Sequence, residues 1–144
     1  MSLEGDYDDA NIFARIVRGE IPCAKVYEDD QIMAFMDAFP QARGHTLVVH
    51  KHSRARNLLE IEPQPLCELM AGVQKIARAV RKALNPDGLV VTQFNGAPAG
   101  QTIFHLHVHI LPRWEGQPLA AHGGGQAEPG ELRRLAEEIG AAVE

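Results

Sequence analysis

Three histidines occupy alternate positions in one short segment, as His105, His107 and His109 with Leu106 and Val108 between them. On a β-strand, residues two apart point to the same face, so the imidazoles would form a row while the apolar residues face the core. An imidazole can bind a metal ion, transfer a proton or attack phosphorus as a neutral nucleophile. This row is therefore the main candidate for a chemical site.

A metal site is the first interpretation of the row, because imidazole is a common zinc ligand. Cα atoms two residues apart on a strand are separated by about 6.6 Å, and those four apart by about 13 Å. The outer histidines therefore cannot both reach one ion at about 2 Å from each nitrogen, and a metal would bind two of the three and recruit other ligands. Nucleophilic attack on phosphorus by the middle histidine, helped by its two neighbours, is the second interpretation. A purely structural row is the third.

A glycine-containing loop over 95–102 directly precedes the row and favours the phosphate interpretation. Gly96 and Gly100 allow backbone N–H groups to approach an anion closely. Gln101 and Thr102 add side-chain donors beside the histidines. A loop of this kind is weak evidence alone, but its position before the row strengthens it.

Apolar spacing predicts the elements that position the row. A short helix begins at Asn11 and ends before Gly19 and Pro22, a long core-packing helix covers 65–84, and a closing helix covers 131–143. Strands are expected over 24–28, 32–37, 46–49, 89–94 and 103–111, the last ended by Pro112, which cannot donate to a sheet. Hairpins with one long helix between strands predict an α+β fold with a mostly antiparallel sheet.

Composition indicates one soluble domain. The chain has 144 residues, of which 45% are apolar and 23% charged, which suits a single core. The net charge of −5, with 14 basic residues scattered among 19 acidic ones, argues against a nucleic-acid-binding face but allows a pocket for a small anion. Cys23 and Cys67 form no metal or disulfide pattern. No apolar run reaches the about 20 residues that span a bilayer, so we expect a cytoplasmic protein without membrane association.

The segment from His105 to Leu111 matches His-φ-His-φ-His-φ-φ, with φ apolar, and in this it resembles the histidine triad (HIT) superfamily. Residues 12–22 look like the family's opening helix and turn, 27–30 like its hairpin, and 35–49 like its central segment. With Gly100-Gln101-Thr102 before the row and Pro112-Arg113 after it, the resemblance covers about residues 11–114.

The resemblance implies separate roles for four histidines. His107 would be the nucleophile that forms a nucleotidyl-histidine intermediate, which water then hydrolyses. His109 would contact the phosphate. His105 and His45 would complete a hydrogen-bonded network that orients His107 and manages its proton. The family also implies a homodimer in which the sheets of two subunits join, and a purine nucleotide held against that sheet.

Further residues match the nucleotide-binding positions of the family. Asp37 matches the ribose-binding carboxylate, which suits two hydroxyl donors. The resemblance places the base against apolar side chains, and the phosphate and leaving group in the glycine-containing loop. The first set is Ile12, Phe13, Ile16 and Phe35, and the second is Asn95, Gly100, Gln101 and Thr102.

Many bacterial relatives bind a structural zinc with Cys-x-x-Cys in the opening helix, a histidine after the central strand and the first triad histidine. Asn11 and Ala14 occupy the cysteine positions here, while His52 and His105 remain. Two imidazoles without thiolates make a poor closed zinc site. We therefore expect no structural zinc and no other cofactor, although a polyphosphate substrate can arrive as a magnesium complex.

The resemblance also suggests how the chain is divided. Residues 1–10 are expected to be a disordered or vector-derived N-terminus, residues 11–114 a HIT domain, and residues 115–144 a C-terminal extension whose helix packs on the same domain. The expected function is hydrolysis or transfer at a nucleotide α-phosphate, with a nucleoside phosphoramidate or a dinucleoside polyphosphate as substrate. The alternative is a non-catalytic regulatory protein that binds purine nucleotides.

Overall fold

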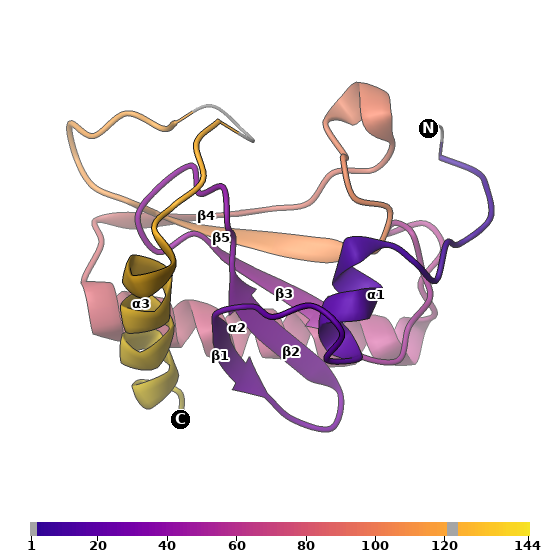
Figure 1. The fold of residues 1–144 in the computed structure, drawn as a ribbon, viewed down its shortest axis with the longest axis horizontal. Helices are drawn as coiled ribbons and strands as arrows, with labels where there is room; N and C mark the ends of the chain where they lie inside the picture. Colours follow the sequence, from indigo (N-terminus) through magenta and orange to yellow (C-terminus); the bar gives the residue numbers. More distant parts are fainter. Residues whose placement is uncertain (1–2, 121–123) are drawn as a thin grey trace.

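The computed structural model describes residues 3–120 and 124–144, which form an antiparallel sheet with helices on both faces (Figure 1). The strand order is β1-β2-β3-β5-β4, and every neighbouring pair is antiparallel. The strands are β1 Lys25–Glu28, β2 Ile32–Met36, β3 Thr46–His50, β4 Gly88–Thr92 and β5 His107–Arg113. The helices are α1 Ile12–Val17, α2 Pro63–Leu84 and α3 Pro129–Ala141, with a 3-10 turn, η1, at Ala97–Ala99. The predicted α+β class and antiparallel sheet are confirmed.

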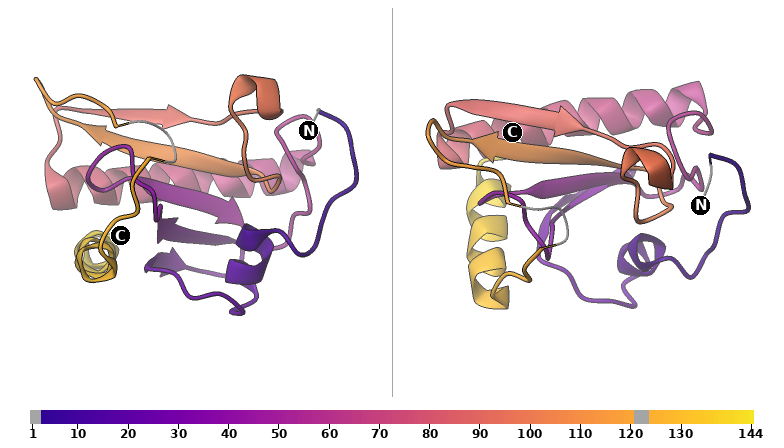
Figure 2. Two further views of the ribbon diagram at one scale, coloured as in Figure 1. Left: turned by 45° about the horizontal axis from the view of Figure 1, so that its top comes forward. Right: turned by 90° about the horizontal axis from the view of Figure 1, so that it is seen from above.

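The two faces of the sheet carry separate apolar clusters. Figure 2 shows α2 and α1 on opposite sides of the sheet. The main core lies under α2 and α3, and its sheet residues include Ile32, Ala34, Val48, Val108 and Ile110. The smaller cluster lies under α1 and consists of Phe13, Ile16, Met33, Phe35, Leu47 and Val49. Because both faces are covered, β2 and β3 are buried along their whole length.

Local chemistry sets the bounds of the helices. α2 has Pro63 in its first turn, where the missing N–H breaks no helical bond, and it begins two residues earlier than predicted. It ends at Leu84, and the C-cap residue Asn85 adopts the left-handed conformation with φ of 49°. Gly140 lets α3 approach β1, because a Cβ at this position would lie 2.6 Å from the carbonyl oxygen of Val26. None of the described helices is long and apolar enough to cross a membrane.

The last strand begins later than its alternating pattern predicts. β5 starts at His107, so His105 lies before the strand in a bend. The cause is a tertiary contact, in which the N–H of Leu106 donates to the carbonyl of Ala55 at 3.0 Å. This hydrogen bond ties the chain to the loop after β3 instead of to a strand. The predicted row is therefore two strand histidines and one histidine from the preceding bend.

The prediction that Pro112 ends the last strand is wrong. Pro112 lies inside β5, where it pairs with Leu89 of β4. The ladder between β3 and β5 extends only from His107 to Ile110. Beyond Ile110, β3 no longer pairs with β5. No carbonyl of β3 therefore requires an N–H from Pro112, and its missing N–H is tolerated.

The N-terminal segment, expected to be disordered over 1–10, is held against the loop after β3 in its described part (Figure 1). The carbonyl of Leu3 accepts hydrogen bonds from Asn57 at 3.0 Å and from Arg56 at 3.2 Å. Asp9 forms an ion pair with Arg54 at 2.9 Å. Partners about 45 or more positions away therefore contact residues 3–9 of this segment.

Candidate active site

His107 and His109 lie on the sheet face that α1 covers. In the ladder between β3 and β5, His107 is opposite Val49 and His109 is opposite Leu47, and both partners belong to the cluster under α1. The ring of Phe13 meets that of His107 edge-on, with centroids 4.8 Å apart. The two histidines are 8% and 2% exposed. The shared face predicted from their spacing is confirmed for this pair.

One short hydrogen bond sets the tautomer of His107. Its Nδ1 lies 2.6 Å from the backbone carbonyl oxygen of His105, and because a carbonyl only accepts, Nδ1 carries the proton. In the neutral ring the lone pair is then on Nε2. This is the form of imidazole that can attack phosphorus. The bend before β5 thus has a chemical consequence, since it aims a carbonyl at the middle histidine.

His45 and His109 form a second pair with defined proton positions. His45 precedes β3 and is fully buried, and its Nε2 lies 2.9 Å from Nδ1 of His109. The N–H of Gln41 donates to Nδ1 of His45 at 3.1 Å, so neutral His45 carries its proton on Nε2 and donates it to His109. The proton of neutral His109 is then on Nε2, where it can meet a phosphate oxygen. The rings of His107 and His109 are 4.9 Å apart, which places this donor beside the nucleophilic ring.

Asp37, directly after β2, lies beside the same pair. Its Oδ2 is 3.5 Å from Nε2 of His45, and its Oδ1 accepts the N–H of Phe39 at 2.8 Å. Ligand atoms of Asp37, His45 and His109 lie within 4.8 Å of one another, the one such group among the described residues. A metal ion at this point would have to displace the proton shared by the two histidines. The hydrogen bonds therefore fit an imidazole network better than a metal site.

His105 is buried in the bend before β5. Burial, with the nearby charge of His107 as a second cause, lowers the pKa of His105 to about 4. Its ring is therefore neutral at neutral pH. The Nδ1 of His105 lies 2.7 Å from the hydroxyl oxygen of Tyr7. Tyr7 was not predicted from the sequence, because no local pattern links two residues that are 98 positions apart.

The residues at the zinc positions of bacterial relatives have other partners here. The Nε2 of His52 lies 2.7 Å from the carbonyl oxygen of Asp30, while His105 contacts the tyrosine described above. Asn11 caps α1, where its side chain accepts the N–H of Ala14 at 2.9 Å. In the described part of the chain, no group of three potential ligands includes His52 or His105. These donors do not fit a closed zinc site.

Gln101 shapes the loop before the row. Its Oε1 accepts the N–H of Gly96 at 2.8 Å, and its amide nitrogen donates to the carbonyls of Arg56 at 2.7 Å and Ile103 at 3.0 Å. Both amide hydrogens are used in these bonds. Gln101 was expected to offer a side-chain donor beside the histidines, but in this structure it organises the loop instead.

The other loop residues differ in their exposure. The side-chain oxygen of Asn95 accepts the N–H of Leu58 at 2.9 Å and the amide of Gln93 at 2.8 Å. Gly100 follows η1 with φ of 107°, a conformation that favours glycine. Residues 97–100 and Thr102 are exposed. The backbone of η1 and the hydroxyl of Thr102 are thus the accessible polar groups of this loop.

The residues expected to receive a base lie on α1 and β2. Phe13, Ile16 and Phe35 are buried in the cluster under α1, while Ile12 is 43% exposed. Phe13 is the member whose ring contacts the histidines. Phe94 was missed by the sequence analysis, and its ring lies 5.4 Å from that of His109. An aromatic residue just before a glycine-containing loop was the signal that could have found it.

His50 has a structural role that its sequence context did not reveal. Its Nδ1 accepts the N–H groups of His52 at 3.1 Å and Ser53 at 3.2 Å, so its proton is on Nε2. That proton is donated to Glu68 of α2 at 2.9 Å, which lowers the pKa of Glu68. His50 thus ties the turn after β3 to α2.

An α+β sheet that buries neutral imidazoles with defined tautomers, next to a glycine-containing loop, is suited to phosphoryl chemistry by histidine. Comparison with known proteins agrees with this class. The model of the HIT domain family matches residues 18–116. The chain belongs to the HIT family of nucleotide hydrolases and transferases, as its motif predicted.

Relatives match over most of their length. Protein hit of Bacillus subtilis is 44% identical over 103 residues, which are 72% of this chain and 70% of that protein. An adenosine 5'-monophosphoramidase of Schizosaccharomyces pombe is 32% identical over 142 residues, covering 92% and 97% of the two chains. The crystal structure of a Hit-like protein from Bartonella henselae is 48% identical with a TM-score of 0.88, covering 96% and 100%. The HIT-like fold is therefore confirmed, and the relatives include a nucleotide-processing enzyme.

Proposed function

We propose that this chain is a nucleotidyl hydrolase that acts at the α-phosphate through a covalent intermediate on His107. The observation that carries this proposal is the hydrogen bond from Nδ1 of His107 to the carbonyl of His105. It places the lone pair on Nε2, as a nucleophile at phosphorus requires. The phosphoramidase activity named for the Schizosaccharomyces pombe relative supports the same class of reaction.

The reaction divides into two displacements at phosphorus. In the first, Nε2 of His107 attacks the α-phosphate and the bond to the leaving group breaks, which joins the nucleoside monophosphate to nitrogen. The leaving group takes up a proton from solvent as it departs. In the second, water attacks the same phosphorus and loses a proton to solvent, the P–N bond breaks with its electron pair returning to Nε2, and the nucleoside monophosphate is released. While the intermediate exists, the ring carries a positive charge, which the carbonyl of His105 stabilises through the Nδ1 proton.

The neighbouring side chains suit the supporting roles. His109 presents an Nε2 proton for a phosphate oxygen, a donor position that His45 sets from its buried site. Asp37 lies beside them with a carboxylate that suits the two ribose hydroxyls. Phe13 offers an aromatic surface next to the nucleophile for the base. Thr102 and the backbone around η1 are assigned to the phosphate and leaving group.

No step of this mechanism uses a bound metal ion. The Nε2 proton of His109, which the hydrogen bond from His45 holds in place, and the backbone of the loop meet the charge of the phosphate. A dinucleoside polyphosphate would arrive with magnesium bound to its own phosphates. A nucleoside phosphoramidate would need no cation, and a metal chelator therefore distinguishes the two substrate classes.

A homodimer is proposed through the β4 edge of the sheet. β4 pairs only with β5 among the described strands, has no charged residue, and exposes Val90 and Val91 by 43% and 46%. The opposite edge, β1, carries Lys25 and Glu28, and its register shifts between Lys25 and Tyr27. Charged side chains and an irregular register discourage pairing with another strand. The uncharged β4 edge is therefore the better surface for a second subunit.

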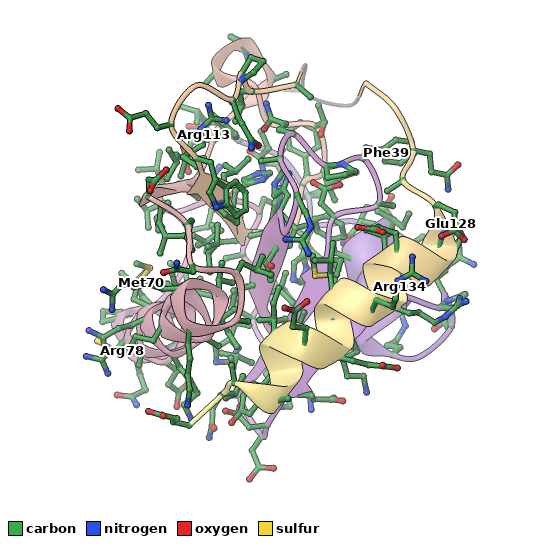
Figure 3. All side chains as sticks on the ribbon, turned by 90° about the vertical axis from the view of Figure 1, so that its left-hand side faces the viewer. Phe39, Met70, Arg78, Arg113, Glu128 and Arg134 are labelled. Atoms are coloured by element: carbon green, nitrogen blue, oxygen red, sulfur yellow. The ribbon has the colours of Figure 1, made fainter. Side chains whose placement is uncertain are left out.

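The outer side of α2 is consistent with such a partner. Figure 3 shows Met70 and Arg78 pointing outward from α2. Met70 is 45% exposed, and a large apolar side chain at the surface is suited to burial against a second subunit. Arg78 is also exposed on this helix. The helix therefore offers mixed apolar and charged contacts, as the rim of an interface does.

A substrate panel tests the proposed function and also distinguishes the two substrate classes. It compares adenosine and guanosine phosphoramidates with diadenosine polyphosphates, with and without EDTA, and identifies products by chromatography. Rapid quenching in alkaline denaturant during turnover, which preserves the acid-labile P–N bond, followed by mass spectrometry, searches for a nucleoside monophosphate on the peptide that contains His107. Turnover with the adduct on His107 supports the proposal. Nucleotide binding without turnover of any substrate would instead favour a regulatory nucleotide-binding protein.

A further inference from the structure

The N-terminal segment reaches the histidine row through one side chain. The hydroxyl oxygen of Tyr7 lies 2.7 Å from Nδ1 of His105, and the two ring centroids are 5.8 Å apart. Independent contacts hold this tyrosine in place. Arg54 pairs with Asp9 at 2.9 Å and lies over the Tyr7 ring, 5.1 Å from its centroid. Tyr7 is therefore anchored to the loop after β3 without depending on the histidine.

The direction of this hydrogen bond follows from the protonation of both groups. Burial raises the pKa of Tyr7, so its hydroxyl keeps its proton at neutral pH. Burial lowers the pKa of His105 to about 4, so this ring is neutral. His105 also forms a hydrogen bond to the backbone of His50 that favours the protonated ring, as a carbonyl acceptor does. The proton of neutral His105 is then on Nε2, and its Nδ1 accepts the hydroxyl of Tyr7.

The same histidine holds the nucleophile by its backbone. The carbonyl of His105 accepts Nδ1–H of His107 at 2.6 Å. The ring and the carbonyl of His105 are attached to one Cα. Because Tyr7 and the backbone of His50 hold the His105 ring at its two nitrogens, the backbone carbonyl of His105 is also restricted in its rotation. The contacts form a continuous series from Tyr7 through His105 to His107.

We propose that Tyr7 is a positioning residue, whose hydroxyl holds His105 as its Nε2–H tautomer and so keeps the carbonyl of His105 on Nδ1 of His107. This inference rests on the proposed role of His107 as nucleophile. Tyr7 acts through His105 and touches no reacting atom. If the hydroxyl were lost, the buried Nδ1 of His105 would lack its donor, and the ring would turn or change tautomer.

A role in catalytic geometry differs measurably from simple anchoring of the segment. Loss of anchoring would lower stability without changing the His105 tautomer in the folded protein. Loss of positioning would change the tautomer and reduce kcat, while KM stays close to its original value because Tyr7 is not among the residues assigned to nucleotide binding. Arg54→Gln separates these effects, since it removes the ion pair to Asp9 and the cation over the Tyr7 ring but keeps the hydroxyl and its hydrogen bond to His105.

The test compares Tyr7→Phe with Tyr27→Phe, the same change at the chain's other tyrosine, whose hydroxyl donates to Asp29 at 3.0 Å away from the histidines. Long-range 1H–15N NMR of the imidazoles reports each tautomer. We expect unmodified His105 to be Nε2–H. In Tyr7→Phe we expect a second tautomer or a broadened signal, with kcat about tenfold lower and KM within about twofold. Tyr27→Phe and Arg54→Gln should keep both the tautomer and kcat.

Each possible result decides the inference. An Nδ1–H tautomer of His105 in the unmodified protein overturns it without any variant. Unchanged NMR signals and kcat in Tyr7→Phe overturn it as well, and so does an equal fall of kcat in Arg54→Gln. If the unmodified protein turns over no substrate, the proposed function fails, while the NMR comparison still decides whether Tyr7 sets the tautomer of His105.

Discussion

The Nε2 of His45 lies 2.9 Å from the Nδ1 of His109, although 64 positions separate them in the chain. His45→Ala would remove this donor and leave the partly buried N–H of Gln41 without its acceptor. We expect the free energy of unfolding to fall by about 2–4 kcal/mol and kcat to fall by at least about tenfold, measured by urea denaturation and steady-state kinetics.

The exposed His52 provides the control for this change. Its ring contacts a backbone carbonyl at the surface, so His52→Ala should change stability by no more than about 0.5 kcal/mol and leave kcat unchanged. A His45→Ala protein with the kcat of the original chain would show that the buried pair serves packing alone.

His107→Ala should abolish turnover. The variant lacks the nitrogen that attacks phosphorus but keeps the other nucleotide contacts, so affinity for a nucleoside monophosphate should stay within about tenfold, or about 1.4 kcal/mol. Calorimetric titration and single-turnover kinetics measure the two quantities separately. Turnover at the original rate would contradict the mechanism.

Stability should decrease in acid partly because of His105. Burial lowers its folded-state pKa to about 4, against about 6.5 in the unfolded chain. Between these values the unfolded chain binds more protons, so the contribution is complete above about pH 6.5 and is lost as the pH falls toward about 4. The full effect is about 3 kcal/mol.

The variant His105→Asn should therefore lose less stability than the original chain between about pH 7 and about pH 4.5. Urea denaturation at several pH values gives the comparison, and the difference between the two proteins removes the titration of the other groups. Parallel curves would mean that His105 titrates normally in the folded state.

The mass in solution should be close to twice the 15.8 kDa of the chain. Val91→Lys would place a charge on the β4 edge and should shift the protein toward the monomer in light scattering after gel filtration. Gln31→Lys, at the exposed hairpin between β1 and β2, is the matched control and should remain dimeric. Loss of the dimer in both variants would place the interface elsewhere.

The fold was largely predictable because periodicity reports burial. The alternation around Val108 and Ile110 predicted which side of β5 faces α2, and the helical spacing predicted α2 within two residues at its start. The His-φ-His-φ-His pattern indicated the family, which the match over 18–116 confirms. These signals are local, and each depends on residues within one element.

The arrangement of the site was decided by contacts between distant segments. His105 lies outside the predicted strand because Leu106 is hydrogen-bonded to Ala55. Gln101 points into the loop because its side chain donates to the carbonyl of Arg56. Tyr7 reached the row from the other end of the chain. No local spacing encodes such partners, since they depend on which polar groups the folded backbone brings within hydrogen-bond distance.

The sequence by itself therefore determined that histidines would share a sheet face, and which family that pattern belongs to. Only the tertiary structure decided where each imidazole proton lies. A tautomer is set by the acceptor or donor opposite each ring nitrogen. For His107 that partner is a carbonyl in a bend, and for His109 it is a histidine from before β3.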